Sequence, residues 1–421
     1  MLSRLSVLRI SFLNRILIVP VMPRLIHPSS HPHPYVLPHL PRGGKNVPRK
    51  GKNAGSKAKP YDLYGIGNAI MDVIVELDER ELEKHGLRKG QFNHLSAKQH
   101  ARIEHALRNK RKTLAPGGSA ANAVALFAQL GGKAAFCGKV ARDSMGRLYR
   151  AAMHEIGVTP LIQDSRHAKS MTARAISMIT ADSERTFAVH LGAAKELLKR
   201  DVSVKELAKA EHMHVEGYLF DKAGLRKAAE HALAHAKQNG VRISIDLADP
   251  GVIARNKKEV ARLVQRYADI VFANEAEAET LTGFKDPVKA LRALGKHARI
   301  AIVKLGKNGS LILHEGRLIR IKAYLAKAVD TTGAGDAYAG AFLYALSCGH
   351  SLQEAGNLAS FLSAKVVEQL GARLQRIPSY RHIFMKADTS GKKQGKKQGK
   401  KQDKKKGKKQ QKIKRKQQKT R

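Results

Sequence analysis

The stretch DTTGAGDAYAGAFLYALSCG, residues 330–349, joins a glycine-rich turn to an apolar helical pattern. The pattern predicts a helix beginning around Ala334–Asp336, whose first N–H groups lack intrahelical partners and attract negative charge. Asp336 would ordinarily cap this helix, but a carboxylate beside an anion-binding helix end can also take a proton from an attacking hydroxyl. The stretch is not a Walker A loop, because no GxxxxGK[ST] precedes it. Taken alone, these residues leave capping and catalysis both open.

A second glycine motif, APGGSAANAVALFAQLGG, spans residues 115–132. Gly117 and Gly118 would let the backbone approach a ligand closely, and the spacing predicts a helix from about Ser119–Ala120. Asn122, one turn into that helix, offers both a donor and an acceptor, which suits a diol better than a phosphate. A plain turn with a capped helix gives the same pattern, so this motif is a weak indication by itself.

Residues 61–387 alternate between strand-like and helical patterns, which predicts an α/β domain with a mostly parallel sheet. In such sheets ligands lie beyond the carboxyl ends of the strands. Polar or glycine residues follow four of the apolar runs: Asn68 and Asp72, Asp246 and Asp249, Asn274 and Glu277, and Gly306 and Gly309. We expect them to meet at one edge of the sheet, although helix caps account for some of them.

The net charge of +43 is concentrated at the two ends of the chain. Residues 1–60 hold 11 Lys or Arg and no acid, while 391–421 hold 17 and a single acid, Asp403. The composition predicts disorder for a basic extension (1–60) and for a Lys/Gln-rich tail (388–421). The tail is predicted either to attract polyanions such as RNA or an anionic surface, or only to aid solubility.

The N-terminal segment contains one uninterrupted apolar run, ILIVPVM (16–22), which is too short to span a bilayer. Its Arg- and Ser-rich, acid-free composition is typical of an organelle transit peptide, although translation from Met22 would remove it. Cys137 and Cys348 are expected to be free and buried, as in a reducing compartment. His231 and His235 have ligand spacing but no third ligand, so a solvated helix face is the preferred interpretation, and His212 and His214 are expected to be structural.

The order of five motifs resembles the ribokinase-like, or phosphofructokinase-B-type, kinase family. The motifs are GNAIMD (67–72), GGSAAN (117–122), NEAE (274–277), KLGKNGS (304–310) and DTTGAGD (330–336). The resemblance covers about residues 61–385, and GNAIMD together with SERTFAVHLGAA (183–194) is most similar to adenosine kinases. It implies a three-layer α/β/α domain with a small β-sheet lid, the lid coming from about 73–95 and 170–190.

The resemblance also implies residue roles. Asp336 would be the catalytic base, and the backbone of Gly333, Ala334 and Gly335 would form an anion hole. The implied substrate-binding residues are Asn68, Asp72, Gly117, Gly118 and Asn122, and the implied nucleotide-binding residues are Asn274, Lys304, Gly306, Gly309 and Arg185. Glu277 would hold Mg²⁺, directly or through water, and Asp330 and Thr332 match a monovalent-cation (K⁺) site of some members. Lys304 departs from the family, which often has threonine there.

The expected activity is ATP- and Mg²⁺-dependent phosphorylation of a nucleoside hydroxymethyl group, with adenosine as the first candidate and purine salvage in the cytoplasm as the setting. A sugar kinase acting on ribose, fructose or a related furanose is the alternative, and Phe92, Phe136 and Phe187 are the candidates for stacking a purine. A hypothesis of another class is a nucleic-acid- or ribosome-associated protein that binds through its basic ends. A monomer and a dimer are both compatible with the sequence.

Overall fold

The computed structural model describes residues 35–36, 59–90, 92–182 and 184–385. The predicted extension (1–60) lies almost entirely outside the described residues, and the predicted tail (388–421) lies wholly outside them. The proposed domain boundaries at 61 and 387 therefore stay predictions.

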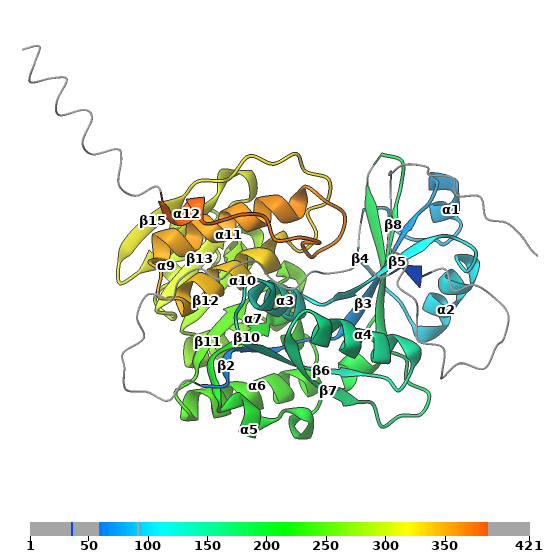
Figure 1. Cartoon of the computed structure of the whole chain (residues 1–421), viewed down its shortest axis with the longest axis horizontal. Coiled ribbons are helices and arrows are strands. Elements are labelled where there is room, and N and C mark those ends of the chain that lie inside the picture. The colour runs from blue at the N-terminus through cyan, green and yellow to red at the C-terminus, as the bar shows by residue number, and fades with distance from the viewer. Residues whose placement is uncertain (1–34, 37–58, 91, 183, 386–421) are drawn as a thin grey trace, which may run out of the picture. The chain divides into compact units, whose positions relative to one another are not determined.

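The larger sheet has nine strands in the order β15-β14-β13-β12-β11-β10-β2-β6-β7 (Figure 1). All neighbours from β7 to β13 are parallel, and β14 and β15 add an antiparallel edge. The strands are β2 (Tyr61–Ile66), β6 (Ala134–Val140), β7 (Val158–Asp164), β10 (Ala210–Glu216), β11 (Arg242–Asp246), β12 (Ile270–Asn274), β13 (Ile300–Lys304), β14 (Ser310–His314) and β15 (Arg317–Ile321). A mostly parallel sheet, as predicted, is confirmed.

Successive side chains of these strands enter two different hydrophobic cores, because strand side chains alternate between faces. In β2, Leu63 belongs to one core and Tyr64 to the other, and in β12, Phe272 and Val271 divide in the same way. One core contains α3 (Ser119–Gln129), α4 (Ser144–Glu155), α10 (Ala334–Ser347) and α11 (Leu352–Val367). The other contains α6 (Ala223–Gln238), α7 (Pro250–Tyr267), α8 (Glu275–Thr282) and α9 (Pro287–Leu294). This is the three-layer α/β/α arrangement that the resemblance implied.

A smaller, six-stranded sheet forms the lid element, in the order β1-β5-β3-β8-β9-β4 (Figure 1). Its strands are β1 (Tyr35–Val36), β3 (Ile70–Glu76), β4 (Phe92–His94), β5 (Lys112–Gly117), β8 (Ala173–Ile179) and β9 (Arg185–His190). Helices α1 (Glu79–Glu83) and α2 (Ala97–Ala106) lie between its strands in the sequence. Strand β5 was not predicted as part of the lid, because KTLAPG ends in a turn-like Pro-Gly pair.

The remaining helical elements are short: α5 (Val204–Leu207), α12 (His382–Met385) and the 3₁₀ turns Gly192–Glu196, Lys199–Asp201, Gly217–Phe220 and Gly306–Asn308. Within the described ranges, no helix is both long enough and apolar enough to cross a membrane. Cys137 and Cys348 are buried, as predicted, and they are not joined in a disulfide.

Candidate active site

The N-terminus of α10 carries Asp336 in its first turn. Gly333 is the N-cap residue, with φ of +78°, and a Cβ on it would lie 2.5 Å from the carbonyl oxygen of Ala372. A glycine is therefore required here by both conformation and space. The amide of Ala334 donates to Thr331 O at 3.3 Å, and the first intrahelical bond runs from Ala337 N to Gly333 O at 2.8 Å. The amides of Gly335 and Asp336 precede that bond, so the helix leaves both available; Gly335 belongs to the predicted anion hole, and Asp336 adds an amide that was not predicted.

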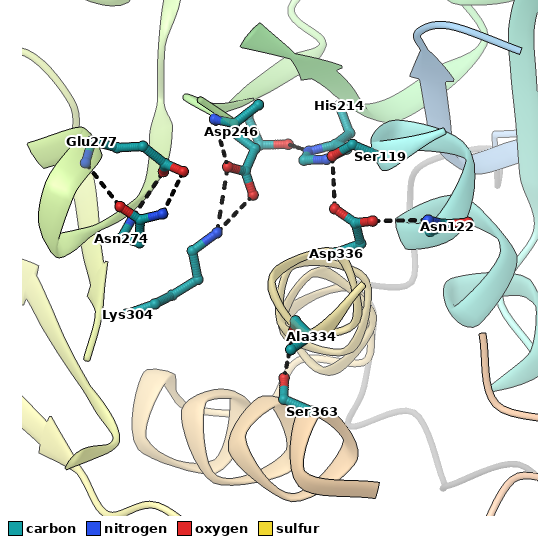
Figure 2. A network of polar contacts seen from close by, with 12 residues as sticks. Ser119, Asn122, His214, Asp246, Asn274, Glu277, Lys304, Ala334, Asp336 and Ser363 are labelled. Atoms are coloured by element: carbon teal, nitrogen blue, oxygen red, sulfur yellow. Dashed lines mark hydrogen bonds and ion pairs between the residues drawn. The ribbon is translucent and has the colours of Figure 1, made fainter. Parts of the chain in front are cut away.

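Two residues of α3 hold the carboxylate of Asp336, one at each oxygen (Figure 2). Ser119 Oγ donates to Oδ1 at 2.7 Å and Asn122 Nδ2 donates to Oδ2 at 2.9 Å. The structure thus joins the two glycine motifs, which lie more than two hundred residues apart in the sequence. Burial raises the pKa of Asp336, and the hydrogen bonds from Asn122 and Ser119 oppose that rise. Asp336 is only partly buried, so its carboxylate remains within reach of a ligand.

Lys304 lies at the same helix end (Figure 2). Its Nζ is 3.0 Å from Asp246 Oδ2, and a Cβ built on Gly335 would lie 3.0 Å from Nζ. A cation is disfavoured beside the positive end of a helix unless acids hold it there or an anion binds. Asp246 supplies the acid and raises the pKa of Lys304 against the effect of burial, with Glu277 and Asp336 contributing. Lys304 therefore sits by the predicted anion hole rather than only on the nucleotide strand.

Asn274 and Glu277 form a capping box at the start of α8. Glu277 Oε2 accepts from Asn274 N at 2.8 Å, Asn274 Oδ1 accepts from Glu277 N at 2.8 Å, and Asn274 Nδ2 donates to Glu277 Oε1 at 2.6 Å. Burial raises the pKa of Glu277 to about 7, while Lys304 lowers it. In the described part of the chain no group of three or more His, Cys, Asp or Glu is placed to hold a metal. One carboxylate of this kind suits Mg²⁺ that keeps most of its ligands from water and phosphates.

Asp72, on the lid strand β3, lies beside the Gly117–Gly118 turn. A Cβ on Gly117 would be 2.3 Å from Asp72 Oδ2, and one on Gly118 would be 2.1 Å from Asn68 O. Burial raises the pKa of Asp72 to about 7, and Arg373 is the strongest influence in the opposite direction. The predicted substrate residues of GNAIMD and GGSAAN are thus brought together at the junction of the lid and α3.

Asn68 is held by a buried glutamate that the sequence analysis did not select. Glu216, at the end of β10, accepts from Asn68 N at 2.8 Å, from Asn68 Nδ2 at 2.7 Å and from Ala120 N at 2.8 Å. This carboxylate joins the carboxyl end of β2 to the first turn of α3. An acid directly after the apolar run HMHV was the available signal for it.

Arg185 and Asp330 form an ion pair between the lid and the loop before α10. Arg185 Nη1 lies 2.7 Å from Asp330 Oδ2, with the two side chains 10% and 1% exposed. Asp330 also accepts from Thr332 N at 2.9 Å and from Gly371 N at 2.7 Å. Arg185 was predicted to reach phosphates and Asp330 to bind a monovalent cation. In the structure Arg185 supplies the counter-charge of Asp330, and its Nε and Nη2 are buried with no hydrogen-bond partner among the described residues.

Gly306 and Gly309 form the turn between β13 and β14, where they were expected. Gly309 has φ of +90°, and its amide donates to Gly306 O at 3.1 Å. Among the predicted stacking residues, Phe136 is fully buried in the core against Tyr149, whereas Phe187 is half-buried on β9 opposite Phe92.

The four histidines singled out from the sequence belong to no metal-binding group in the described part of the chain, although His231 and His235 are less exposed than a solvated face would make them. The rings of His231 and His235 are 4.5 Å apart on a half-buried face of α6. His212 and His214 are buried in β10, and His214 Nδ1 is 2.9 Å from Ser244 Oγ. Two further residues at the site, Ser119 and Arg373, were missed. Ser119 lay unselected within GGSAAN, and nothing local in the sequence marks Arg373.

The fold and the site together define an α/β phosphotransferase, and comparison with known proteins gives its family. The family model of the pfkB family carbohydrate kinases matches residues 90–379, and the chain belongs to that family. It is therefore a kinase with a hydroxyl group as acceptor, and kinases of this family use ATP and a divalent metal.

Three similar proteins illustrate the range of the family. Adenosine kinase from Sinorhizobium meliloti is 35% identical, covering 75% of this chain and 96% of that one, with a TM-score of 0.68. A probable sugar kinase from Rhizobium etli is 33% identical, covering 76% and 96%, also with a TM-score of 0.68. 5-Dehydro-2-deoxygluconokinase of Halalkalibacterium halodurans is 31% identical over 279 residues, which are 63% of this chain and 83% of that protein.

Proposed function

We propose that this kinase transfers the γ-phosphoryl group of ATP to the 5′-hydroxymethyl group of a nucleoside, with adenosine as the first candidate and AMP as its product. The observation that carries the proposal is the carboxylate of Asp336, held between Ser119 and Asn122 at the open N-terminus of α10. A base and an anion-binding helix end in one place are what transfer to a neutral alcohol requires.

In the proposed reaction the substrate hydroxyl binds against Asp336. As the hydroxyl oxygen attacks the γ-phosphorus, its proton passes to Asp336, and the bond from phosphorus to the bridging oxygen breaks to release ADP. The free amides at Gly335 and Asp336, with Lys304 beside them, stabilise the charge on the transferred group. Asp72 is proposed to accept hydrogen bonds from the ribose hydroxyls, and Asn122 is proposed to donate to them. Asn68, Gly117 and Gly118 are proposed to shape that pocket.

Asn274 and Glu277 are proposed to hold Mg²⁺ through water and the phosphates of ATP. The metal would neutralise charge on the β- and γ-phosphates. The donor set fits this role, because Glu277 is a buried carboxylate that already accepts from Asn274 and can orient a metal-bound water without encircling the ion. The nucleotide is proposed to lie along β13 and the Gly306–Gly309 turn.

Adenosine is preferred over a sugar on two observations. The GNAIMD and SERTFAVHLGAA motifs resemble adenosine kinases, and an adenosine kinase is 35% identical to the chain. Phe187 on the lid is the aromatic residue proposed to cover the base, since Phe136 is used in the core. A furanose kinase remains the alternative, supported by the 31% identity to 5-dehydro-2-deoxygluconokinase. An AMP-forming activity would serve purine salvage in the cytoplasm.

The test is a substrate panel with ATP and Mg²⁺, covering adenosine, guanosine, inosine, cytidine, ribose and fructose. Adenosine is expected to give the highest kcat/KM. Turnover of a sugar alone would replace the nucleoside proposal by the furanose alternative, and no phosphorylation of any acceptor would reject both.

The role of Asp336 is tested in the same assay. Asp336→Asn is expected to fold and to lose about 10²–10⁴-fold in kcat, because an amide cannot take the proton. Asp286→Asn is the matched control: Asp286 is an exposed N-cap of α9 that accepts from Lys289 N at 2.7 Å, away from the site. Near-normal turnover of Asp336→Asn would make Asp336 only a helix cap.

A further inference from the structure

Arg373 is a buried arginine at the site to which no role has been given. It is 9% exposed and follows α11 in the sequence. Its Nε donates to Asn122 Oδ1 at 2.8 Å, and its Nη1 lies 3.4 Å from Met153 Sδ. Its Nη2 is buried with no hydrogen-bond partner among the described residues. Burying a guanidinium without a directly bonded carboxylate is costly, so a merely structural side chain at this position would be better apolar.

The hydrogen bond from Arg373 determines which way the amide of Asn122 points. An arginine can only donate, so it selects the oxygen of Asn122. The Nδ2 group must then face the opposite way, toward Asp336 Oδ2 at 2.9 Å, where an ionised carboxylate can only accept. The chain Arg373–Asn122–Asp336 therefore has one consistent arrangement of donors and acceptors.

The groups around Arg373 also favour its positive charge at this position. Burial lowers the pKa of Arg373, and Tyr149, Asp72 and Asp336 act to raise it. Two of these three groups are the carboxylates proposed to bind the substrate and to take its proton. Tyr149 OH in turn donates to Gly117 O at 2.9 Å, beside the glycine turn that packs on Asp72. The guanidinium therefore lies near both carboxylates of the proposed acceptor site, Asp72 and Asp336.

We propose that Arg373 is a positioning residue for phosphoryl transfer, which orients Asn122 so that Nδ2 holds the carboxylate of Asp336 in place for the acceptor hydroxyl. The proposal rests on the proposed function of Asp336. Arg373 acts through Asn122 and touches no reacting atom, so its loss affects turnover more than the binding of ATP.

The experiment is a double-mutant cycle in the full-length kinase with the best acceptor of the panel. Arg373→Met is expected to lower kcat by about 10²-fold, as misplacement of a reacting group does, with the KM for ATP nearly unchanged. In the Asn122→Ala background, with kcat measured at saturating acceptor and about pH 9 so that Asp72 is ionised, the same substitution is expected to cost less than about threefold, because the path through Asn122 is already lost.

Arg226→Met is the matched control. Arg226 Nη1 donates to Asn256 Oδ1 at 2.9 Å, the same type of contact between α6 and α7. This variant is expected to keep the wild-type kcat. If Arg373→Met unfolds, the cycle is run with Arg373→Lys, which keeps the charge, and the same lack of additivity is expected.

The outcomes separate the two proposals. An inactive wild type on every acceptor rejects the proposed function. An active wild type with near-normal kcat in the Arg373 variants, or an Arg373 loss that is equally large with and without Asn122, overturns the positioning role while leaving the function of Asp336 intact.

Discussion

Asp72 links the charges of the acceptor site to a measurable pH dependence. Burial, together with the charges of Asp336 and Asp330, raises its pKa to about 7, against the opposing effect of Arg373 and Arg185. If ionised Asp72 accepts hydrogen bonds from the acceptor hydroxyls, binding requires the deprotonated form. A raised pKa then means that activity is lost as the pH falls through about 7, well above the range of an exposed aspartate.

This pH dependence is the first prediction. The kcat/KM for the acceptor, measured from about pH 5.5 to about pH 9, should show an acid limb near 7. Arg373→Met should shift that limb to higher pH, because it removes the strongest influence that lowers the pKa of Asp72. Asp72→Asn should abolish the limb along with most acceptor binding. An acid limb near 4, unchanged by Arg373→Met, would contradict this role for Asp72.

The start of α10 depends on Gly333. Gly333→Ala places a methyl group 2.5 Å from Ala372 O at a φ of +78°, so strain and overlap add. The control is Gly283→Ala at a φ of +82°, where nothing lies within 4 Å of the new Cβ and only the strain of about 1–2 kcal/mol remains. We expect the control to unfold at a slightly lower temperature and to keep a normal kcat. We expect Gly333→Ala to lose more stability and at least about tenfold in kcat.

Thermal unfolding and steady-state kinetics of the two glycine variants check this prediction. Equal losses of stability and equal kcat in both would show that the contact with Ala372 does not position Asp336.

The lid is tied to the main domain through Arg185 and Asp330, and the third prediction concerns that ion pair. In Arg185→Met the Asp330 carboxylate keeps two backbone donors but loses its counter-charge. Removal of one partner leaves a buried charge uncompensated. A monovalent cation would restore that charge, so the variant should be activated by KCl relative to choline chloride at equal ionic strength, whereas the wild type should respond little.

The measurement is the activity in KCl relative to that in choline chloride, for the variant and for the wild type. A wild type that requires K⁺ as strongly as the variant would show that Arg185 does not replace a cation at Asp330. Arg262→Met, which breaks ion pairs with Glu230 and Glu259 on the far helices, serves as the control for loss of an arginine pair elsewhere.

The same elements show what the sequence could and could not predict. The mostly parallel sheet was predicted because parallel strands buried on both faces, such as β2, β11, β12 and β13, read as continuous apolar segments. Edge strands such as β15, RLIRI, carry exposed arginines and give no such signal. Asp336 was selected because its motif is local, whereas Arg373 was not, since its contact with Asn122 spans 251 positions and depends on packing between α3 and the segment after α11.

The proposed catalytic residues and the densest positive charge lie in different parts of the chain. Every residue of the proposed site lies between Asn68 and Arg373, while 17 Lys or Arg lie in residues 391–421. Phosphate contacts by such a segment would be insensitive to base sequence and would weaken steeply with salt. The prediction follows that deletion of 388–421 leaves kcat and KM unchanged but lowers retention on heparin and on RNA.

A variant of the same length with the lysines and arginines of 392–421 replaced by glutamine distinguishes charge from length. It should behave like the deletion in retention and like the wild type in kinetics. The salt concentration that releases the protein from RNA should fall in both variants by the same amount, because the positive charge that holds phosphate is removed in each. A tail deletion that abolishes phosphorylation would instead place the basic segment within the catalytic unit, and one that leaves RNA retention unchanged would assign the binding to the rest of the chain, including the basic residues of 1–60.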